Sequence, residues 1–245
     1  MAAGRPASLT RERIIQAVVE LLERNSAEPV TTRLVGEALE VHPTALYRHF
    51  RDMDELVRAA ADQILADLVP ADAASLGFGA GGAGGAGGSK AAGPTAVSPA
   101  RALDAVATTC RALRRTLLSH PSAARVMASA PSLQLNERRL TEYLLALLVN
   151  AGLPDSEAAL AYHALVEYTV GSATIDYAIA VDGESLAHEN WRSVYRGSSP
   201  QVHPVSVRLA EHLYPNQDDQ FEYGLGLMIA SLRTRCGVVE AIYGL

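Results

Sequence analysis

The chain has 245 residues, with 21 Lys and Arg against 27 Asp and Glu, and this length allows one large domain or two small ones. Apolar residues make up 49% of the chain and charged residues 20%, which excludes disorder throughout. The formal charge of −6 excludes a general polycationic surface for nucleic acid. A contact with DNA therefore needs a local basic patch.

The cysteine pattern and the hydropathy of the chain indicate the cellular compartment of the protein. Cys110 and Cys236 lie far apart and outside any C-x-x-C spacing, which supports neither a disulfide framework nor a zinc site. Residues Met1 to Pro6 lack the apolar core of a signal peptide, and no segment resembles a membrane span of about 18 apolar residues. We therefore expect a cytoplasmic protein that does not enter the membrane.

Helical periodicity dominates, and strand signals are nearly absent, so the sequence predicts an all-α protein. After Thr10, a good N-cap, apolar residues recur on one helical face up to about Arg24. A second, short helix is expected after Thr31 or Thr32. Its expected inward positions are Leu34, Val35 and Ala38.

A third short helix is expected from Pro43 to His49, because proline fits the first helical position. Leu46 and Phe50 are expected to point inward. A fourth helix is expected from Asp52 to Val69, with Asp52 as its N-cap and Pro70 after its end.

Nine glycines fall between Gly77 and Gly93, which predicts a flexible insert. Further helices are expected at 100–119, 122–129, 136–151 and 155–181. We expect a loop over 182–204, a short helix over 205–213 and a last helix over 218–242.

The last expected helix carries a continuous apolar stripe that must be covered. The stripe comprises Phe221, Leu225, Met228, Ile229 and Leu232. Pairing this helix and 155–181 with their symmetry mates would form a four-helix dimer interface.

The second and third expected helices, joined by a short turn, have the arrangement of a helix-turn-helix unit. Residues 42–51 contain Arg48 and Arg51 and no acidic residue, so basic charge is concentrated at the third helix. Tyr47, Thr44 and His42 offer polar groups there, and a helix N-terminus attracts phosphate. These features alone leave open a small three-helix core with a solvated arginine face.

Four segments together resemble the N-terminal domain of the tetracycline-repressor (TetR) family. They are Leu9-Thr10-Arg11-Glu12, Val30-Thr31-Thr32-Arg33-Leu34-Val35, His42-Pro43-Thr44-Ala45-Leu46-Tyr47-Arg48-His49-Phe50 and Asp54-Glu55-Leu56-Val57. The resemblance implies binding to double-stranded operator DNA. The implied contact residues are Thr32, Arg33, His42, Pro43, Thr44, Tyr47, Arg48 and His49.

Two positions depart from the family pattern. Glu40 stands where the family turn usually has glycine, and a non-glycine residue at positive φ costs about 1 kcal/mol. Met53, between Asp52 and Asp54, stands where the family usually has a phosphate-contacting lysine. DNA binding is therefore expected to depend more on Arg48 and Arg51.

The resemblance continues through residues 100–242, on Arg114-Arg115-x-Leu117-Leu118, Gly171 and Phe221-Glu222-Tyr223-Gly224-Leu225. It implies a helical domain that forms a homodimer and binds a small-molecule effector. The expected organisation is a helix-turn-helix domain at 1–51, a connecting helix at 52–70, an insert at 71–99 and the effector domain at 100–245. The insert is expected to be a tolerated surface excursion.

The resemblance also locates an effector pocket. Its polar positions in tetracycline repressors correspond here to Leu68, Thr109, Leu113, Met127, Leu144 and Glu167. Because Met127 stands at the metal-ligand position, we expect no magnesium–tetracycline chelate and no metal or cofactor. A lining that also includes Tyr143, Leu147 and Tyr162 suits a largely apolar molecule. The alternative is that these residues simply fill the core.

No catalytic motif is present, and the histidines are scattered, so we expect no enzyme. His163 and Glu167 have an i, i+4 spacing that suits a metal, but a core or pocket histidine is the favoured interpretation. The sequence therefore predicts a transcriptional repressor that an effector releases from a palindromic operator. The alternative is a helical ligand-binding or enzymatic protein with a vestigial helix-turn-helix.

Overall fold

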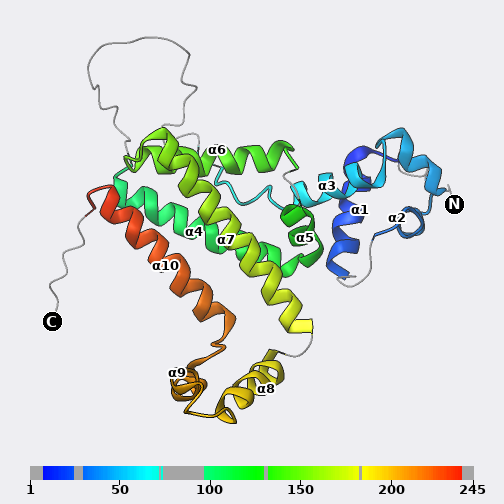
Figure 1. Ribbon diagram of the computed structural model, residues 1–245. Helices are drawn as coiled ribbons and strands as arrows, with labels where there is room; N and C mark the ends of the chain where they lie inside the picture. Colours follow the sequence, from blue (N-terminus) through cyan, green and yellow to red (C-terminus); the bar gives the residue numbers. More distant parts are fainter. Residues whose placement is uncertain are drawn as a thin grey trace, which may run out of the picture.

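The computed structural model describes residues 8–24, 30–71, 73, 97–129, 132–181 and 184–238. Every regular element in these ranges is a helix, which confirms the all-α prediction (Figure 1). Most of the expected insert at 71–99 lies outside the described residues, as does the end of the chain from residue 239.

The N-terminal unit consists of α1 (Arg11–Arg24), α2 (Thr32–Leu39), the 3₁₀ helix η1 (Pro43–Arg48) and α3 (Met53–Gln63). Their apolar faces meet in one small core, as the periodicity predicts. Its buried members include Ile14, Val18, Leu22, Val35, Leu46, Phe50, Leu56 and Ala60.

Two expectations for this unit are wrong. Ala38 is exposed, and Gly36 and Leu39 are buried instead, because α2 turns that face toward η1. The expected helix 52–69 ends earlier, since α3 stops at Gln63. After Gln63 the chain continues in turns with i to i−3 hydrogen bonds, such as Leu65 N–H to Asp62 O at 3.0 Å. Pro70 disfavours helical geometry at the residue before it.

The second unit is built around α4 (Pro99–Ser119), which contacts α5 (Pro121–Ser129), α6 (Leu135–Asn150), α7 (Asp155–Val181) and α10 (Gln217–Arg235). These five helices share one large apolar core. α5 also contacts α1 and α3, and α6 contacts α3. The N-terminal unit is therefore mounted on the larger one through α3, α5 and α6 (Figure 1).

The expected loop over 182–204 is wrong, because α8 (Glu184–Arg196) occupies most of it. α9 (Pro204–Arg208) and η3 (Ala210–His212) follow, and the three elements project from the bundle (Figure 1). Trp191 packs on Tyr214 with ring centroids 4.9 Å apart. Arg192 donates to the backbone oxygens of Leu213 and Tyr214 at 2.9 and 2.7 Å. These long-range contacts stabilise a helix within the stretch 182–204, whose overall Gly, Ser, Asn and Pro content predicted a loop.

The last helix ends at Arg235 and does not reach 242. Gly237 has φ of 67°, and the N–H of Val238 donates to the Arg233 oxygen at 2.9 Å, which closes the helix as a glycine C-cap. The apolar stripe of this helix is covered by its own chain, because Phe221, Leu225 and Leu232 are buried in the bundle core. The expectation that a symmetry mate covers this stripe is therefore wrong.

Candidate DNA-binding and effector sites

The turn between α2 and η1 is tightly built. Glu40 has φ of 56° and ψ of 39°, the left-handed conformation expected where the family has glycine. The N–H of Val41 donates to the Gly36 oxygen at 2.9 Å. A Cβ on Gly36 would lie 3.0 Å from the Val41 oxygen and 3.2 Å from Pro43 Cγ, so only glycine fits without a shift. This close approach fixes η1 against α2.

His42 caps the start of η1. Its Nδ1 accepts the N–H of Thr44 at 3.4 Å and lies 2.8 Å from the Thr44 hydroxyl oxygen. When Nδ1 accepts, the proton of the neutral ring is on Nε2. The exposed His42 ring can then donate a hydrogen bond to an acceptor outside the protein.

The side chains of η1 divide into a buried and an exposed set. Leu46 is 1% exposed and Phe50 3%, whereas Tyr47 is 50% exposed and Arg48 is also exposed. Of the other expected DNA contacts, Arg33, His42 and Thr44 are exposed, and the remaining three are half-buried, namely Thr32, Pro43 and His49. The structure therefore leaves a polar, basic surface on α2 and η1.

Two acidic residues limit the basic charge of this surface. Glu37 accepts from Arg33 Nε at 2.7 Å, and this hydrogen bond raises the pKa of Arg33. Glu55 accepts the backbone N–H and Nε of Arg51 at 2.9 and 3.1 Å and lies 3.5 Å from Arg11 Nη2. The hydrogen bonds from Arg51 lower the pKa of Glu55. Arg51 is thus engaged by α3, a contact that the sequence reasoning missed.

The expected effector residues lie mainly in the bundle core. Thr109, Leu113, Tyr143, Leu144 and Leu147 are buried between α4, α6 and α7. Three more are partly buried against the same core, namely Leu68, Met127 and Tyr162. Glu167 is exposed on the outer side of α7, so the structure does not bring it to the others within one chain.

Two polar side chains of the expected effector lining, Thr109 and Tyr162, already have partners. The Thr109 hydroxyl donates to the Ala105 oxygen at 2.8 Å. The Tyr162 and Thr141 hydroxyl oxygens lie 2.8 Å apart, and burial raises the pKa of Tyr162. An effector entering this core would have to displace side chains and exchange these hydrogen bonds.

A hollow of about 420 Å³ opens beside this core, between the segment after α3 and the start of α6. Tyr143 belongs both to the hollow and to the expected effector set. The remaining lining residues are Val69, Pro70, Ala71, Ala73, Leu135, Arg138, Arg139 and Glu142.

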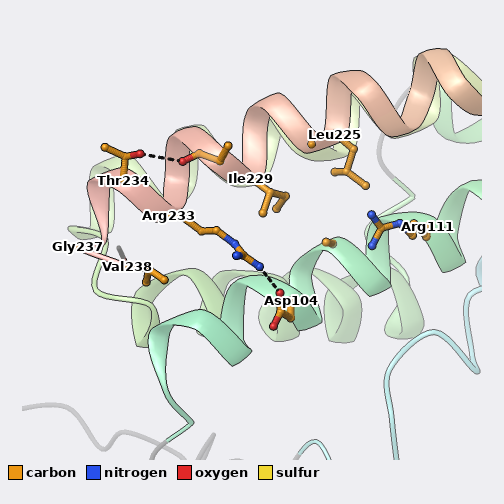
Figure 2. Close-up of a pocket in the computed structure, with 11 residues that line it drawn as sticks. Asp104, Arg111, Leu225, Ile229, Arg233, Thr234, Gly237 and Val238 are labelled. Atoms are coloured by element: carbon orange, nitrogen blue, oxygen red, sulfur yellow. Dashed lines mark hydrogen bonds and ion pairs between the residues drawn. The ribbon is translucent and has the colours of Figure 1, made fainter. Parts of the chain in front are cut away.

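A separate groove of about 560 Å³ lies between α4 and α10. Figure 2 shows Arg233 of α10 reaching across it to Asp104, with Nη2 and Oδ1 2.5 Å apart. Arg111 forms a bidentate pair with Glu222 of α10 at 2.7 and 2.8 Å. The sequence reasoning missed this groove, although small residues such as Gly226 on one side of the helix were a signal.

A buried ion pair joins three helices of the bundle. Arg114 of α4 is 6% exposed and donates to Asp176 of α7 at 2.6 Å and to Asp218 of α10 at 2.6 Å. Its guanidinium carbon lies 4.8 Å from the ring centroid of Phe221. This contact fixes the start of α10 against α4 and α7.

Within the described ranges, no three or more His, Cys, Asp or Glu residues gather as a metal site. His163 and Glu167 are both exposed. None of the described helices has the length and apolar character needed to cross a membrane.

A helix-turn-helix unit mounted on a helical bundle is the architecture of a DNA-binding regulator. Residues 14–60 match the family of bacterial regulatory proteins, tetR family, and residues 101–236 match the tetracyclin repressor-like, C-terminal domain. The chain therefore belongs to the TetR family of transcriptional regulators.

Individual relatives agree with this assignment. The chain is 26% identical over 168 residues to an HTH-type transcriptional regulator of Saccharopolyspora erythraea, a match that covers 69% of this chain and 61% of that protein. It is 25% identical over 235 residues to the class A tetracycline repressor protein from transposon 1721 of Escherichia coli, covering 94% of each.

Among solved structures, the chain is similar to apo ActR from Streptomyces coelicolor. The TM-score is 0.77 at 24% identity, with 96% of this chain and 99% of that chain covered. ActR has also been solved in complex with actinorhodin. At this identity the likeness shows the fold.

Proposed function

We propose that this chain is a ligand-responsive repressor that binds a palindromic operator as a homodimer and leaves it when a largely apolar small molecule binds. The observation that carries the proposal is the exposed pair Tyr47 and Arg48 on η1, held in place by the tight turn at Gly36 and Glu40. The family assignment supports transcription regulation and DNA binding.

Each exposed group has a defined role in the proposed DNA contact. Tyr47 donates its hydroxyl to a phosphate, and Arg48 binds a phosphate or a guanine edge. His42 donates from Nε2, and Thr44 and Arg33 add contacts around it. Half-buried Thr32, Pro43 and His49 shape the surface beside them.

The proposed dimer uses the outer faces of α7 and α10. These faces carry large apolar side chains that are exposed in the single chain: Leu160 at 71%, Ile175 at 60%, Tyr223 at 71% and Leu227 at 57%. Exposed apolar side chains gathered on two adjacent helices suit pairing with a second copy. The proposed dimer interface, called the dimer seam below, therefore lies on the side of α10 opposite to Leu225.

The proposed effector site is the core between α4, α5, α6 and α7, entered through the hollow at Tyr143. Its lining is mostly apolar, which suits a largely apolar molecule and no metal. ActR, of the same fold, is known with actinorhodin bound, which supports a small-molecule site in this chain. We place the protein in the cytoplasm, where it would reach its operator.

A footprint on the DNA upstream of the chain's own gene tests the proposal. We expect protection with dyad symmetry and half-sites about one helical turn, or a multiple of it, apart. Absence of a specific footprint would favour a helical ligand-binding or enzymatic protein with a vestigial helix-turn-helix.

A thermal-stability screen of small molecules identifies the effector. A compound at a hundred times its Kd adds about 2.7 kcal/mol of stability and is easily detected.

A further inference from the structure

The end of α3 is attached to the start of α6 by one carboxylate. Asp62, on the last turn of α3, is 7% exposed. Its Oδ1 accepts the N–H of Glu137 at 2.8 Å, and its Oδ2 accepts the N–H of Asn136 at 3.1 Å. The Asn136 side-chain amide also donates to Oδ2 and to the Asp62 backbone oxygen, at 3.1 and 3.2 Å.

These bonds replace the usual cap of α6. The residue at the N-cap position, Gln134, makes no side-chain cap hydrogen bond. Asn136 and Glu137 are the second and third residues of α6, and their N–H groups are those that an N-cap side chain normally accepts. Asp62 therefore caps α6 from a different helix, and its negative charge lies at the positive end of the helix dipole.

The turn before α6 is fixed as well. The Glu137 carboxylate accepts from the N–H of Leu133 at 2.8 Å and from the Ser132 hydroxyl. Leu133 has φ of 54°, a conformation that costs a leucine about 1 kcal/mol or more. The first turn of α6 is therefore held on both sides, which makes it a defined support for Asp62.

α3 and the turn that follows it connect the cores of the two units of the protein. Leu56 and Ala60 lie in the core of the helix-turn-helix unit, whereas Leu65, just after α3, lies in the core of the bundle. A change in the position or capping of α6 would act directly on the end of α3, which shares its core with Leu46 of η1. The hollow at Tyr143, the proposed effector entrance, is lined by Leu135, the residue before Asn136.

We infer that Asp62 is a positioning residue for operator binding: by capping α6 from α3 it sets the orientation of the helix-turn-helix unit on the bundle. The inference rests on the proposed function, since it describes how the effector domain acts on the DNA-binding unit. An effector that moves the start of α6 would release or redirect α3 through this carboxylate.

Asp62→Ala and a matched cap removal test the inference. Asn216 caps α10 by accepting the N–H of Asp219 at 2.8 Å, far along the chain from α3. Asn216→Ala therefore removes a comparable helix cap away from the contact between α3 and α6. We expect Asp62→Ala to weaken operator binding at least tenfold, and Asn216→Ala to lower the melting temperature with less than a twofold change in affinity. Equal changes in affinity for the two variants would overturn the inference.

Asp62→Asn keeps one acceptor oxygen and places an amide nitrogen opposite the donors of Asn136, so it loses part of the cap without a change in size. We expect it to weaken operator binding less than Asp62→Ala does. If Asp62→Ala does not fold, the inference is tested by measuring amide hydrogen exchange in Asp62→Asn. Faster exchange must then appear both in α3 and in the first turn of α6, and a change confined to α6 would overturn the inference. If the unmodified chain binds no upstream DNA, the proposed function fails, and the same exchange measurement still decides on Asp62.

Discussion

The expected DNA-contact surface and the expected effector pocket differ in how exposed their side chains are. Tyr47 of η1 is 50% exposed, whereas Leu113 of α4 is 1% exposed and Leu147 of α6 is fully buried. The first residue belongs to the expected DNA contacts and the other two to the expected effector pocket. A DNA contact requires only that a side chain on a correctly folded helix points outward. A pocket requires that neighbouring side chains leave space, which depends on the whole bundle.

The largest expected effect concerns the interior of the bundle. Arg114→Ala leaves Asp176 buried without its cation and should destabilise the protein by about 3–5 kcal/mol in a denaturant titration. Arg111→Ala is the control, because Arg111 and Glu222 are 41% and 47% exposed and such pairs contribute about 0–1 kcal/mol. Similar losses for both variants would show that burial of Arg114 does not matter.

The proposed dimer seam distinguishes the two faces of α10. Leu227→Arg should raise the dimer dissociation constant at least a hundredfold, about 2.7 kcal/mol, while the monomer stays folded. Leu225→Arg should instead unfold the bundle, since Leu225 is 0% exposed. Sedimentation measures the association state of each variant, and circular dichroism measures whether it is folded. A folded monomer from Leu225→Arg would reverse the assignment of the faces.

The exposed surface of η1 should affect binding and leave stability unchanged. Tyr47→Ala and Arg48→Ala should each weaken operator binding by about 1–3 kcal/mol without changing the unfolding midpoint. Leu46→Ala, one residue away, should cost about 2–5 kcal/mol of stability because Leu46 is 1% exposed. Binding at full affinity by both surface variants would exclude η1 as the recognition element.

The smallest expected effect is at the turn. Glu40→Gly should stabilise the N-terminal unit by about 1 kcal/mol, because glycine adopts the left-handed conformation without steric cost. Glu40→Ala is the control and should give no gain. A loss of stability in Glu40→Gly would indicate that the glutamate side chain makes a contribution of its own.

The sequence predicted most of the helices, and the reasons for its errors are physical. Capping residues such as Thr31 and Asp52 act on their own helices, so α2 and α3 begin where the sequence indicates. α8 was missed because contacts such as Trp191 with Tyr214 stabilise it across the chain. The role of Asp62 was also missed, since nothing local to α3 shows that its carboxylate caps α6. The DNA-contact and effector assignments stay predictions.

The central claim is that a small molecule in the bundle controls operator binding, and one titration tests it directly. Operator affinity is measured with and without the compound that stabilises the protein most in the thermal screen. We predict a loss of about a hundredfold at saturation, which corresponds to about 2.7 kcal/mol of coupling between the two sites. A tightly bound compound that leaves operator affinity unchanged would contradict the account.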